Sequence, residues 1–217
     1  MGFAGLVGAG RTEVMRAIFG ADPRTSGDIY IKGKKVEINK PIDAIEKGIS
    51  LVPEDRKGQG VSLTMSIREI FTSMSEQICQ AGRVNLKKDR EWSEKYIKAL
   101  EIKNAYNGAE VKNLSGGNQQ KVAIAKWLVT NSDIIILDEP TRGIDVGAKQ
   151  EIYLLMNQLI EQGKSLIMIS SEMPELLGMS DRILVMHEGT ITGEVSRQEA
   201  TQQLILEYAS GGKMSEV

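Results

Sequence analysis

The segment Gly5-Leu6-Val7-Gly8-Ala9-Gly10-Arg11-Thr12 carries the strongest indication of the fold of this 217-residue chain. The apolar residues from Phe3 to Val7 predict the end of a buried strand, and Val14 and Ile18 recur at helical spacing after the turn. Glycines between a strand and a helix let backbone N–H groups wrap an anion at the positive end of the helix. The segment therefore fits the phosphate-loop pattern G-x-x-x-x-G-K-[ST], except that Arg11 replaces lysine.

A glycine-rich turn between a strand and a helix could also belong to two other kinds of structure. A dinucleotide-binding turn, G-x-G-x-x-G, is excluded because Glu13 occupies the position of the third glycine. A glycine turn that only joins a strand to a helix remains open on this segment alone. In a phosphate loop Thr12 would offer its hydroxyl to Mg²⁺, whereas the planar guanidinium of Arg11 is a bulkier group than the ammonium it replaces.

A second segment, Asp133-Ile134-Ile135-Ile136-Leu137-Asp138-Glu139-Pro140, is an apolar strand that ends in two carboxylates. The carboxyl ends of strands form the edge at which α/β sheets bind ligands. There Asp138 can hold Mg²⁺ and Glu139 can polarise an attacking water, as phosphoryl transfer requires. The alternative is a strand followed by an acidic turn without a ligand.

The most specific segment is Leu114-Ser115-Gly116-Gly117-Asn118-Gln119-Gln120-Lys121. It places a serine and two glycines at the start of a predicted helix, where backbone N–H groups favour anions. Its last glycine precedes Asp138 by 21 residues (138 − 117), so the segment is not part of the first loop. A simple helix cap is the alternative interpretation.

Hydrophobic patterning predicts an α/β fold with a mainly parallel sheet. A more polar, helical stretch from Ser66 to Ile102 predicts an insertion between two α/β halves. The predicted elements outside it are strand Gly27–Gly33, helix Pro41–Lys47, strand Ile49–Val52, a charged loop Glu54–Gly60, helix Gln119–Val129, strand Ile134–Leu137, helix Val146–Gln162, strands Leu166–Ser170 and Ile183–Met186, and helix Gln198–Tyr208.

Composition excludes several function classes. With 27 basic and 29 acidic residues the net charge is −2, which argues against a protein whose main role is to bind nucleic-acid phosphates. The single cysteine, Cys79, excludes a disulfide framework or a cysteine-based zinc site. The single histidine, His187, disfavours a Ser-His-Asp triad, and we expect it in a surface turn. No apolar run reaches the roughly 18 residues that span a bilayer, and we expect a cytosolic chain.

Taken together, these segments resemble the nucleotide-binding domain of ATP-binding cassette (ABC) transporters. Gly5–Thr12 is similar to Walker A, Ile134–Glu139 to Walker B, Leu114–Lys121 to the signature and Thr141–Asp145 to the D-loop. A narrower resemblance is to the C-terminal cassette of bacterial monosaccharide importers of the ribose, galactose and xylose type. It rests on the exact sequence of the signature at Leu114–Lys121 and on the stretches Glu139–Lys149 and Ile169–Glu175.

The resemblance implies a P-loop NTPase (RecA-like) fold in one domain. We expect the RecA-like core at about residues 1–60 and 119–217 and a helical subdomain at about 61–118. We also expect that strands normally preceding Walker A are missing from the sequence, together with an upstream aromatic residue that stacks on adenine.

The resemblance also implies the site residues, with ATP and Mg²⁺ as cofactors. Contacts with this chain's own nucleotide are expected from Gly5, Gly8, Ala9, Gly10, Arg11, Thr12 and Glu13. Contacts with the partner's nucleotide are expected from Ser115, Gly116, Gly117 and Asn118. Metal contacts are expected from Thr12, Glu54 and Asp138, and catalytic roles from Glu139 and Ser171. Three of these positions depart from the family pattern: Arg11 replaces lysine, Glu54 the Q-loop glutamine, and Ser171 the switch histidine.

These departures predict a slow site, because losing one electrostatic donor to the transition state costs about 100- to 1000-fold in rate. The cassettes of the family pair head to tail, so we expect this chain's signature to complete a competent site on a second cassette. Implied partners are integral membrane permease subunits and, indirectly, a periplasmic or extracellular sugar-binding protein, with no nucleic acid. The implied location is the cytoplasmic face of the bacterial membrane. A non-hydrolysing regulatory module and an ABC ATPase acting on DNA or ribosomes remain alternatives.

Overall fold

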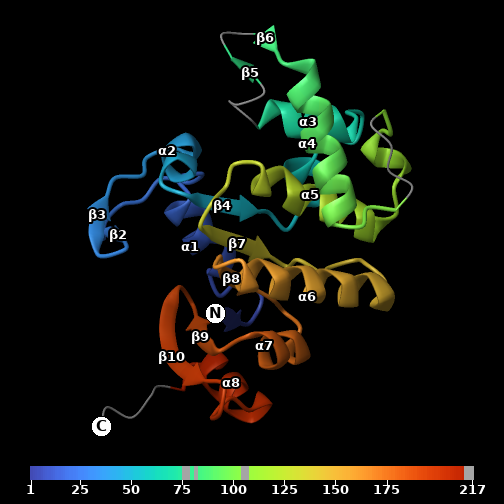
Figure 1. Cartoon of the computed structure of the whole chain (residues 1–217). Helices are drawn as coiled ribbons and strands as arrows, with labels where there is room; N and C mark the ends of the chain where they lie inside the picture. The colour runs from blue at the N-terminus through green and yellow to red at the C-terminus, as the bar shows by residue number, and fades with distance from the viewer. Residues whose placement is uncertain (75–78, 81–82, 104–107, 213–217) are drawn as a thin grey trace. The chain divides into compact units, whose positions relative to one another are not determined.

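The computed structural model describes residues 1–74, 79–80, 83–103 and 108–212, and the chain divides into two compact units (Figure 1). Unit 1 comprises Met1–Leu51, Ile134–Pro140 and Ser165–Val217. Unit 2 comprises Val52–Asp133 and Thr141–Lys164. The helical stretch predicted from Ser66 to Ile102 belongs to unit 2.

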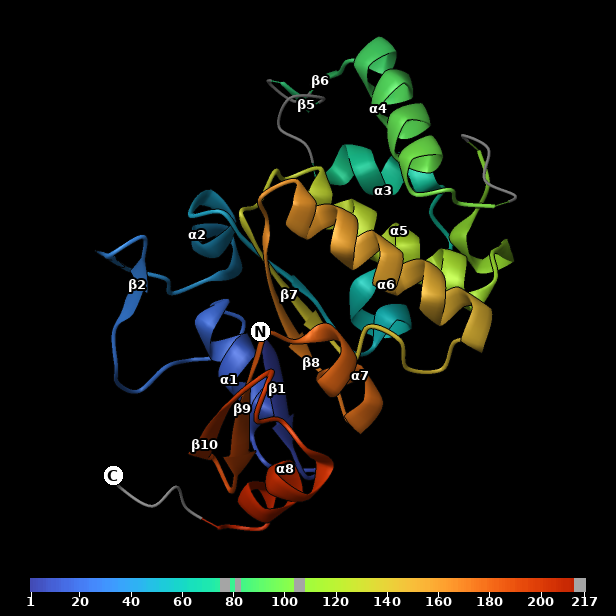
Figure 2. The ribbon, with the colours of Figure 1, turned by 60° about the horizontal axis from the view of Figure 1, so that its bottom comes forward.

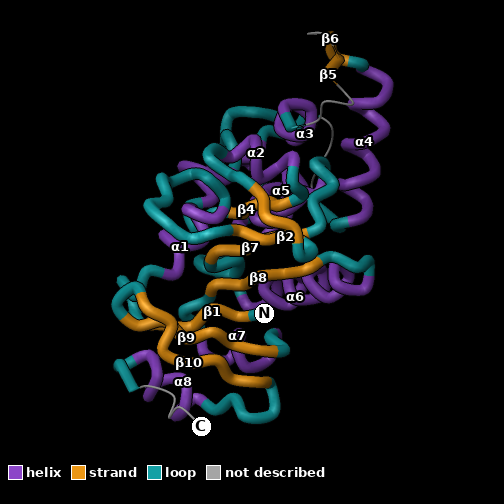
Figure 3. Tube along the Cα trace, turned by 90° about the vertical axis from the view of Figure 1, so that its left-hand side faces the viewer, coloured by secondary structure: helices purple, strands orange, loops and turns teal. Residues whose placement is uncertain are grey.

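Unit 1 is built on a six-stranded sheet, whose strands run side by side in Figure 3. In spatial order the strands are β10 (Thr190–Ser196), β9 (Arg182–His187), β1 (Gly2–Gly5), β8 (Ser165–Ile169), β7 (Ile134–Asp138) and β4 (Ile49–Val52). Strand β1 pairs in parallel with β8 and β9, and β7 pairs in parallel with β8. Only β10 among the described pairings of this sheet is antiparallel, which confirms the predicted mainly parallel α/β sheet.

The sheet of unit 1 is covered by short helices. These are α1 (Arg11–Ile18), α7 (Met173–Met179) and α8 (Gln202–Ala209), all of which pack against β1. Unit 1 also contains α2 (Pro41–Glu46), which begins with proline as predicted. The central strands are apolar because they are buried on both faces. Phe3, Ile136, Leu137 and Val185 are 5% exposed or less.

Unit 2 is mainly helical (Figure 2). Its elements are a π-helical turn (Arg56–Gly60), α3 (Ile67–Ser73), the short strands β5 (Cys79–Gln80) and β6 (Arg83–Val84), α4 (Leu86–Ala99), a 3₁₀ turn (Val111–Asn113), α5 (Gly116–Leu128) and α6 (Val146–Glu161). Helix α3 packs against α4 and α5, and α5 packs against α6. Side-chain caps fix where the helices begin: Ser66, Asn85, Ser115 and Asp145 each accept a hydrogen bond from a first-turn N–H.

Several predicted elements differ from the structure. The predicted strand Gly27–Gly33 is a hairpin of β2 (Ile29–Ile31) and β3 (Lys34–Val36), with Gly33 in its turn at φ 75°. The predicted loop Glu54–Gly60 contains the π-helical turn. Helix α5 begins three residues earlier than predicted, and α8 begins four residues later.

Two elements of unit 1, α7 and β10, were not predicted at all. The expectation that His187 lies in a surface turn is wrong. His187 is the last residue of β9, and its Nδ1 lies 2.8 Å from the Ala209 carbonyl oxygen. Among the described residues, no helix combines the length and the apolar composition needed to cross a bilayer.

Candidate nucleotide site and signature

The predicted phosphate loop is an open turn between β1 and α1 in unit 1. Strand β1 ends at Gly5 and helix α1 begins at Arg11. Gly8 and Gly10 have φ angles of 82° and 94°, a left-handed region that disfavours side chains. The residues at the tip, 6–8, are exposed, and a Cβ built on Gly8 would meet no atom within 4 Å. Ala9 is buried beneath the tip, and its N–H donates to the Leu6 carbonyl.

Arg11 does not extend into this open turn. Its Nη1 donates to the carbonyl oxygen of Ser170 at 2.8 Å, and its Nη2 lies 3.8 Å from Glu139 Oε1. The side chain is only 9% exposed. The positive charge at the lysine position of the loop is therefore directed to the carboxyl ends of β7 and β8.

Glu139 is held from two sides. Its carboxylate faces Arg11 through Oε1, while Oε2 accepts a hydrogen bond from Ser171 Oγ at 3.1 Å. The backbone of Glu139 is left-handed, at φ 46°, and its N–H donates to the Ile169 carbonyl of β8. Unit 1 thus brings together the two predicted catalytic positions, Glu139 and Ser171, with Arg11 at the same site.

Asp138 and Thr12 form the predicted metal-binding pair. Asp138 is 2% exposed, and the Thr12 hydroxyl bonds to its carboxylate. The other oxygen, Oδ1, is buried without a partner in the described structure. Burial raises the pKa of Asp138 to about 6, and the nearby Glu139 charge adds to the shift.

These two residues fit Mg²⁺. Among the described residues, no group of three or more His, Cys, Asp or Glu side chains is placed so that it could hold a metal ion. Mg²⁺ is commonly bound by one or two carboxylates together with substrate phosphates and waters, so the unpartnered oxygen of Asp138 and the Thr12 hydroxyl suffice. Glu13, expected among the nucleotide contacts, is exposed in the first turn of α1.

The signature residues lie in unit 2, at the start of α5. Ser115 caps the helix: its Oγ accepts from the N–H of Asn118 at 3.4 Å and from Nδ2 of Asn118 at 3.0 Å. Asn118 Oδ1 in turn accepts from the N–H of Lys103. Ser115 is exposed, and a Cβ built on Gly117 would lie 2.4 Å from the Cβ of Ala148 in α6. Helices α5 and α6 therefore meet closely at the signature.

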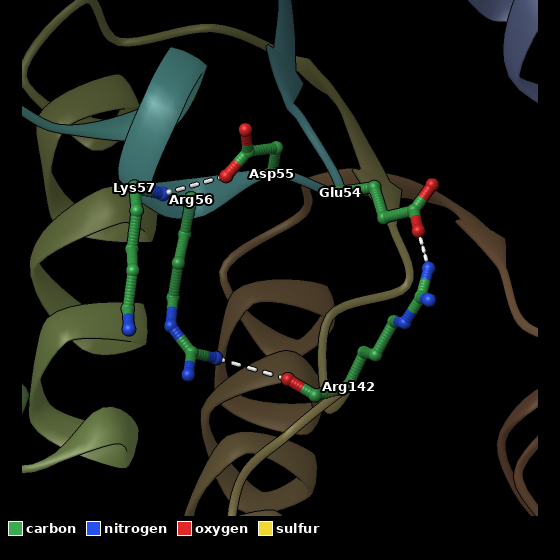
Figure 4. Close-up of a pocket in the computed structure, with 5 residues that line it drawn as sticks. All are labelled: Glu54, Asp55, Arg56, Lys57 and Arg142. Atoms are coloured by element: carbon green, nitrogen blue, oxygen red, sulfur yellow. Dashed lines mark hydrogen bonds and ion pairs between the residues drawn. The ribbon is translucent and has the colours of Figure 1, made fainter.

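Glu54, the third predicted metal contact, belongs to unit 2 and has a cationic partner there. Its Oε1 forms an ion pair with Nη1 of Arg142 (Figure 4). The two residues line a cavity of about 310 Å³ together with Asp55, Arg56 and Lys57. Sequence reasoning singled out neither Arg56 nor Ser170. Arg56 donates to the Arg142 carbonyl, and the Ser170 carbonyl accepts from Arg11; both bonds join residues far apart in the chain, which no local pattern indicates.

Comparison with known proteins agrees with these motifs. The family model described as ABC transporter matches residues 1–142. The chain is 53% identical over 214 residues to the ribose import ATP-binding protein RbsA of Bacillus licheniformis and 51% identical over 214 residues to that of Bacillus subtilis. It is 54% identical over 215 residues to the xylose import ATP-binding protein XylG of Thermoanaerobacter pseudethanolicus. Each match covers 98% of this chain but 43% of the relative, so the chain spans less than half the length of these relatives.

Solved structures share the fold at lower sequence identity. A nucleotide-free ATP-binding cassette from an ABC transporter is 23% identical, with a TM-score of 0.76, covering 95% of this chain and 83% of that one. An ATP-binding cassette of an ABC transporter in its ADP conformation is 24% identical, with a TM-score of 0.76, covering 97% and 87%. The family match extends over more than half of the chain, and the motifs and the fold agree with it. The chain belongs to the ABC transporter family, as an ATP-binding domain.

Proposed function

We propose that this chain binds and hydrolyses ATP to energise import of a monosaccharide of the ribose or xylose type. Support comes from its identity of 50% or more, over 98% of its length, with ribose and xylose import ATP-binding proteins. The open turn at residues 6–8 and the pair formed by Thr12 and Asp138 suit a nucleotide phosphate and its Mg²⁺.

The residues of unit 1 divide the chemistry among them. The turn from Gly5 to Gly10 would offer backbone N–H groups to the phosphates. Thr12 and Asp138 would hold Mg²⁺, which would supply positive charge against the phosphate oxygens. Glu139 orients the attacking water and accepts its proton. That role needs a carboxylate free to face the water, whereas here both oxygens of Glu139 have protein partners.

We infer that this site holds nucleotide but turns it over slowly. The inference rests on one observation, the direction of the Arg11 side chain. Its guanidinium lies against the Ser170 carbonyl and Glu139 instead of pointing into the open turn. A loop without its phosphate-directed cation loses transition-state stabilisation, on the order of 100-fold in rate for one donor. Ser171 bonds to Glu139 through a short hydroxyl and supplies no positive charge.

The signature then acts in a partner cassette. The start of α5 is intact: Ser115 is exposed at the helix N-terminus, and its hydroxyl accepts from Asn118 while keeping its own proton to donate. We propose that Ser115, Gly116 and Gly117 complete the ATP site of a second cassette at the cytoplasmic face of the membrane. Membrane permease subunits and an external sugar-binding protein would be the further partners.

The test is ATP turnover by the assembled transporter, with its second cassette, carrying Glu139→Gln in this chain. If this site is slow, most turnover survives, whereas Gly117→Asp abolishes it. Turnover that collapses as fully as when the second cassette's catalytic glutamate is replaced would show that this site is catalytic, and the inference of a slow site would fail. Absence of sugar-stimulated turnover in the unmodified assembly would remove the import function itself.

One alternative is favoured by a specific observation. The ion pair between Arg11 and Glu139 suits a regulatory module that binds nucleotide without hydrolysing it. An assembly whose second cassette carries a catalytic Glu→Gln change separates the two functions. Residual turnover that disappears on adding Glu139→Gln supports a slow ATPase, and no residual turnover supports the regulatory module.

A further inference from the structure

Two backbone carbonyls of the loop between β7 and α6 accept hydrogen bonds from one side chain of unit 2. Arg56 donates from Nη1 to the Arg142 carbonyl at 2.9 Å (Figure 4). Its Nη2 donates to the Gly143 carbonyl at 3.2 Å. The planar fork of a guanidinium suits two neighbouring acceptors in a way that a lysine ammonium does not. Because both acceptors are backbone atoms, the contact fixes the path of the loop.

Arg56 is itself held by the turn in which it stands. The Asp55 carboxylate accepts from the N–H groups of Lys57 and Gly58 at 3.1 and 2.9 Å, and the Val61 N–H donates to the Arg56 carbonyl at 2.8 Å. The Nε atom of Arg56 is buried. The guanidinium therefore projects from a fixed turn instead of a freely moving segment.

The signature meets the same guanidinium. A Cβ built on Gly116 would lie 3.2 Å from Nη2 of Arg56 and 3.6 Å from the carbonyl oxygen of Gly143. These are close van der Waals approaches, and glycine leaves the space that Arg56 uses. The Arg56 guanidinium thus bonds to the loop after β7 and occupies the space that a side chain at Gly116, in the first turn of α5, would need.

The ion pair between Glu54 and Arg142 is a second link between the same two segments. The Arg142 side chain is 65% exposed and that of Glu54 36% exposed. Exposed ion pairs contribute little to stability because water and salt screen them. The ion pair therefore holds only the end of the Arg142 side chain, whereas the hydrogen bonds from Arg56 hold the backbone of the loop.

We propose that Arg56 is a positioning residue that fixes the loop 141–145 and the signature turn at Gly116 to each other, so that both meet the partner cassette as one surface. The proposal rests on the proposed function in one respect only, namely that the signature acts in the partner's ATP site. Its structural part concerns contacts within unit 2 and is testable without transport or ATP turnover.

The structural test is limited digestion of the full chain by trypsin, which cleaves after Arg142. The carbonyl of that peptide bond is the one that accepts from Arg56 Nη1. Fragments ending at Arg142 are quantified by mass spectrometry relative to cleavage after Arg90, a residue of α4 that reports general unfolding of unit 2. In Arg56→Ala we expect the ratio to rise roughly tenfold, because cleavage follows local opening of the loop.

Two controls separate the contacts. Lys57→Ala changes a neighbouring side chain of the same turn and should leave the ratio unchanged. Glu54→Gln removes the ion pair with Arg142 but leaves the hydrogen bonds from Arg56, so the ratio should rise by no more than about threefold. Arg56→Lys, which keeps charge and most of the side chain, should lie between wild type and Arg56→Ala, and it replaces the alanine variant if that variant fails to fold.

The functional test is ATP turnover by the assembled transporter. A positioning role predicts that Arg56→Ala lowers kcat about tenfold, with KM for ATP unchanged, and that Arg56→Lys restores part of the loss. An unchanged cleavage ratio in Arg56→Ala, or an equal rise in Lys57→Ala, overturns the positioning role. A raised ratio with unaltered kcat confirms the contact but overturns its part in the partner site. If the unmodified assembly shows no turnover, the proposed function fails while the digestion still decides the role of Arg56.

Discussion

Arg11 Nη2 lies 3.8 Å from Glu139 Oε1, while Nη1 of the same guanidinium donates to the Ser170 carbonyl at 2.8 Å. The residue at the cation position of the phosphate loop is thus bonded to the ends of two strands and faces the carboxylate that would activate water. Both side chains are 9% exposed, so water screens their attraction only weakly. Binding of a nucleotide phosphate has to compete with this contact for the charge of Arg11.

Arg11→Lys should activate this site. Lysine has no fork that reaches the Ser170 carbonyl and Glu139 together, so its charge becomes available to phosphate and Glu139 is released. We expect turnover at this site to rise on the order of tenfold or more, since phosphate-directed donors act on the transition state. The measurement is ATP hydrolysis by the assembly in which the second cassette's catalytic glutamate is replaced by glutamine.

The same substitution should cost stability, because the buried Ser170 carbonyl loses a charged donor. We expect the free energy of unfolding of the nucleotide-free chain to fall by about 1–3 kcal/mol, measured by urea titration. Arg11→Ala is the matched control: it should be destabilised comparably but gain no turnover. Equal turnover in Arg11→Lys and the unmodified chain would show that the Arg11 contact does not limit the site.

Asp138→Asn should stabilise the nucleotide-free chain at neutral pH. Burial raises the pKa of Asp138 from 3.8 to about 6, so the folded state retains a proton that the unfolded state releases. The stabilising contribution is therefore fully present below about pH 4 and is lost as pH rises through about 6. Asparagine stays neutral at every pH, and at pH 7.5 we expect a gain of about 3 kcal/mol in the free energy of unfolding.

That gain should shrink at pH 5 and vanish near pH 4, as measured by urea titration at each pH. Asp138→Asn should also lose Mg²⁺-dependent nucleotide binding, since an amide is a poorer ligand for this cation than a carboxylate. A gain of the same size at pH 4 and pH 7.5 would contradict the assignment of the pKa shift to Asp138.

Gly117→Ala should be destabilising, because the added methyl group would lie 2.4 Å from the Cβ of Ala148. Helices α5 and α6 must then separate, at a cost of about 1–3 kcal/mol for overpacking. Gly116→Ala is the matched control. Its methyl group meets the flexible end of Arg56 at 3.2 Å, and the intrinsic preference of alanine for helix, about 0.5–1 kcal/mol, offsets the contact.

A double-mutant cycle with Ala148→Gly tests the cause of this loss. Removing the opposing methyl group should restore room for the methyl group introduced by Gly117→Ala. We therefore expect Gly117→Ala to cost about 1 kcal/mol less in the Ala148→Gly background. Free energies of unfolding from urea titration provide the four values. Additive effects of the two substitutions would mean that residue 117 is constrained by something other than Ala148.

Much of the fold follows from local sequence signals. The apolar run at Ile134–Leu137, the cap at Ser115 and the proline at Pro41 each fix an element by contacts within a few residues, and each prediction lies close to the observed element. Helix α7 and strand β10 lack such signals. The first is a seven-residue helix, and the second mixes threonines with Gly193 and carries an irregularity in its pairing with β9.

The positions of the site residues along the chain could be predicted, but not the directions of their side chains. The pattern of residues identified Arg11 and Glu139, yet it could not show that Arg11 reaches a carbonyl 159 residues away. The partner of Glu54 was equally inaccessible, because Arg142 approaches it only through the tertiary structure of unit 2. Motifs define which chemical groups meet at a sheet edge, whereas the bonds among those groups depend on long-range packing.

Ser115 offers a substitution that separates helix capping from a role in the partner site. Its Oγ accepts from the backbone and side-chain N–H groups of Asn118, and the residue itself is exposed. Ser115→Ala removes the cap and should cost about 1 kcal/mol, while Ser115→Gly should cost only a few tenths, because glycine is tolerated at the N-cap. If the hydroxyl also donates to the partner's nucleotide, both variants should lower turnover of the assembly alike, on the order of 100-fold. Ser115→Thr keeps a hydroxyl and should retain most of the turnover. A glycine variant that is as active as the unmodified chain, beside a weakened alanine variant, would restrict Ser115 to capping α5.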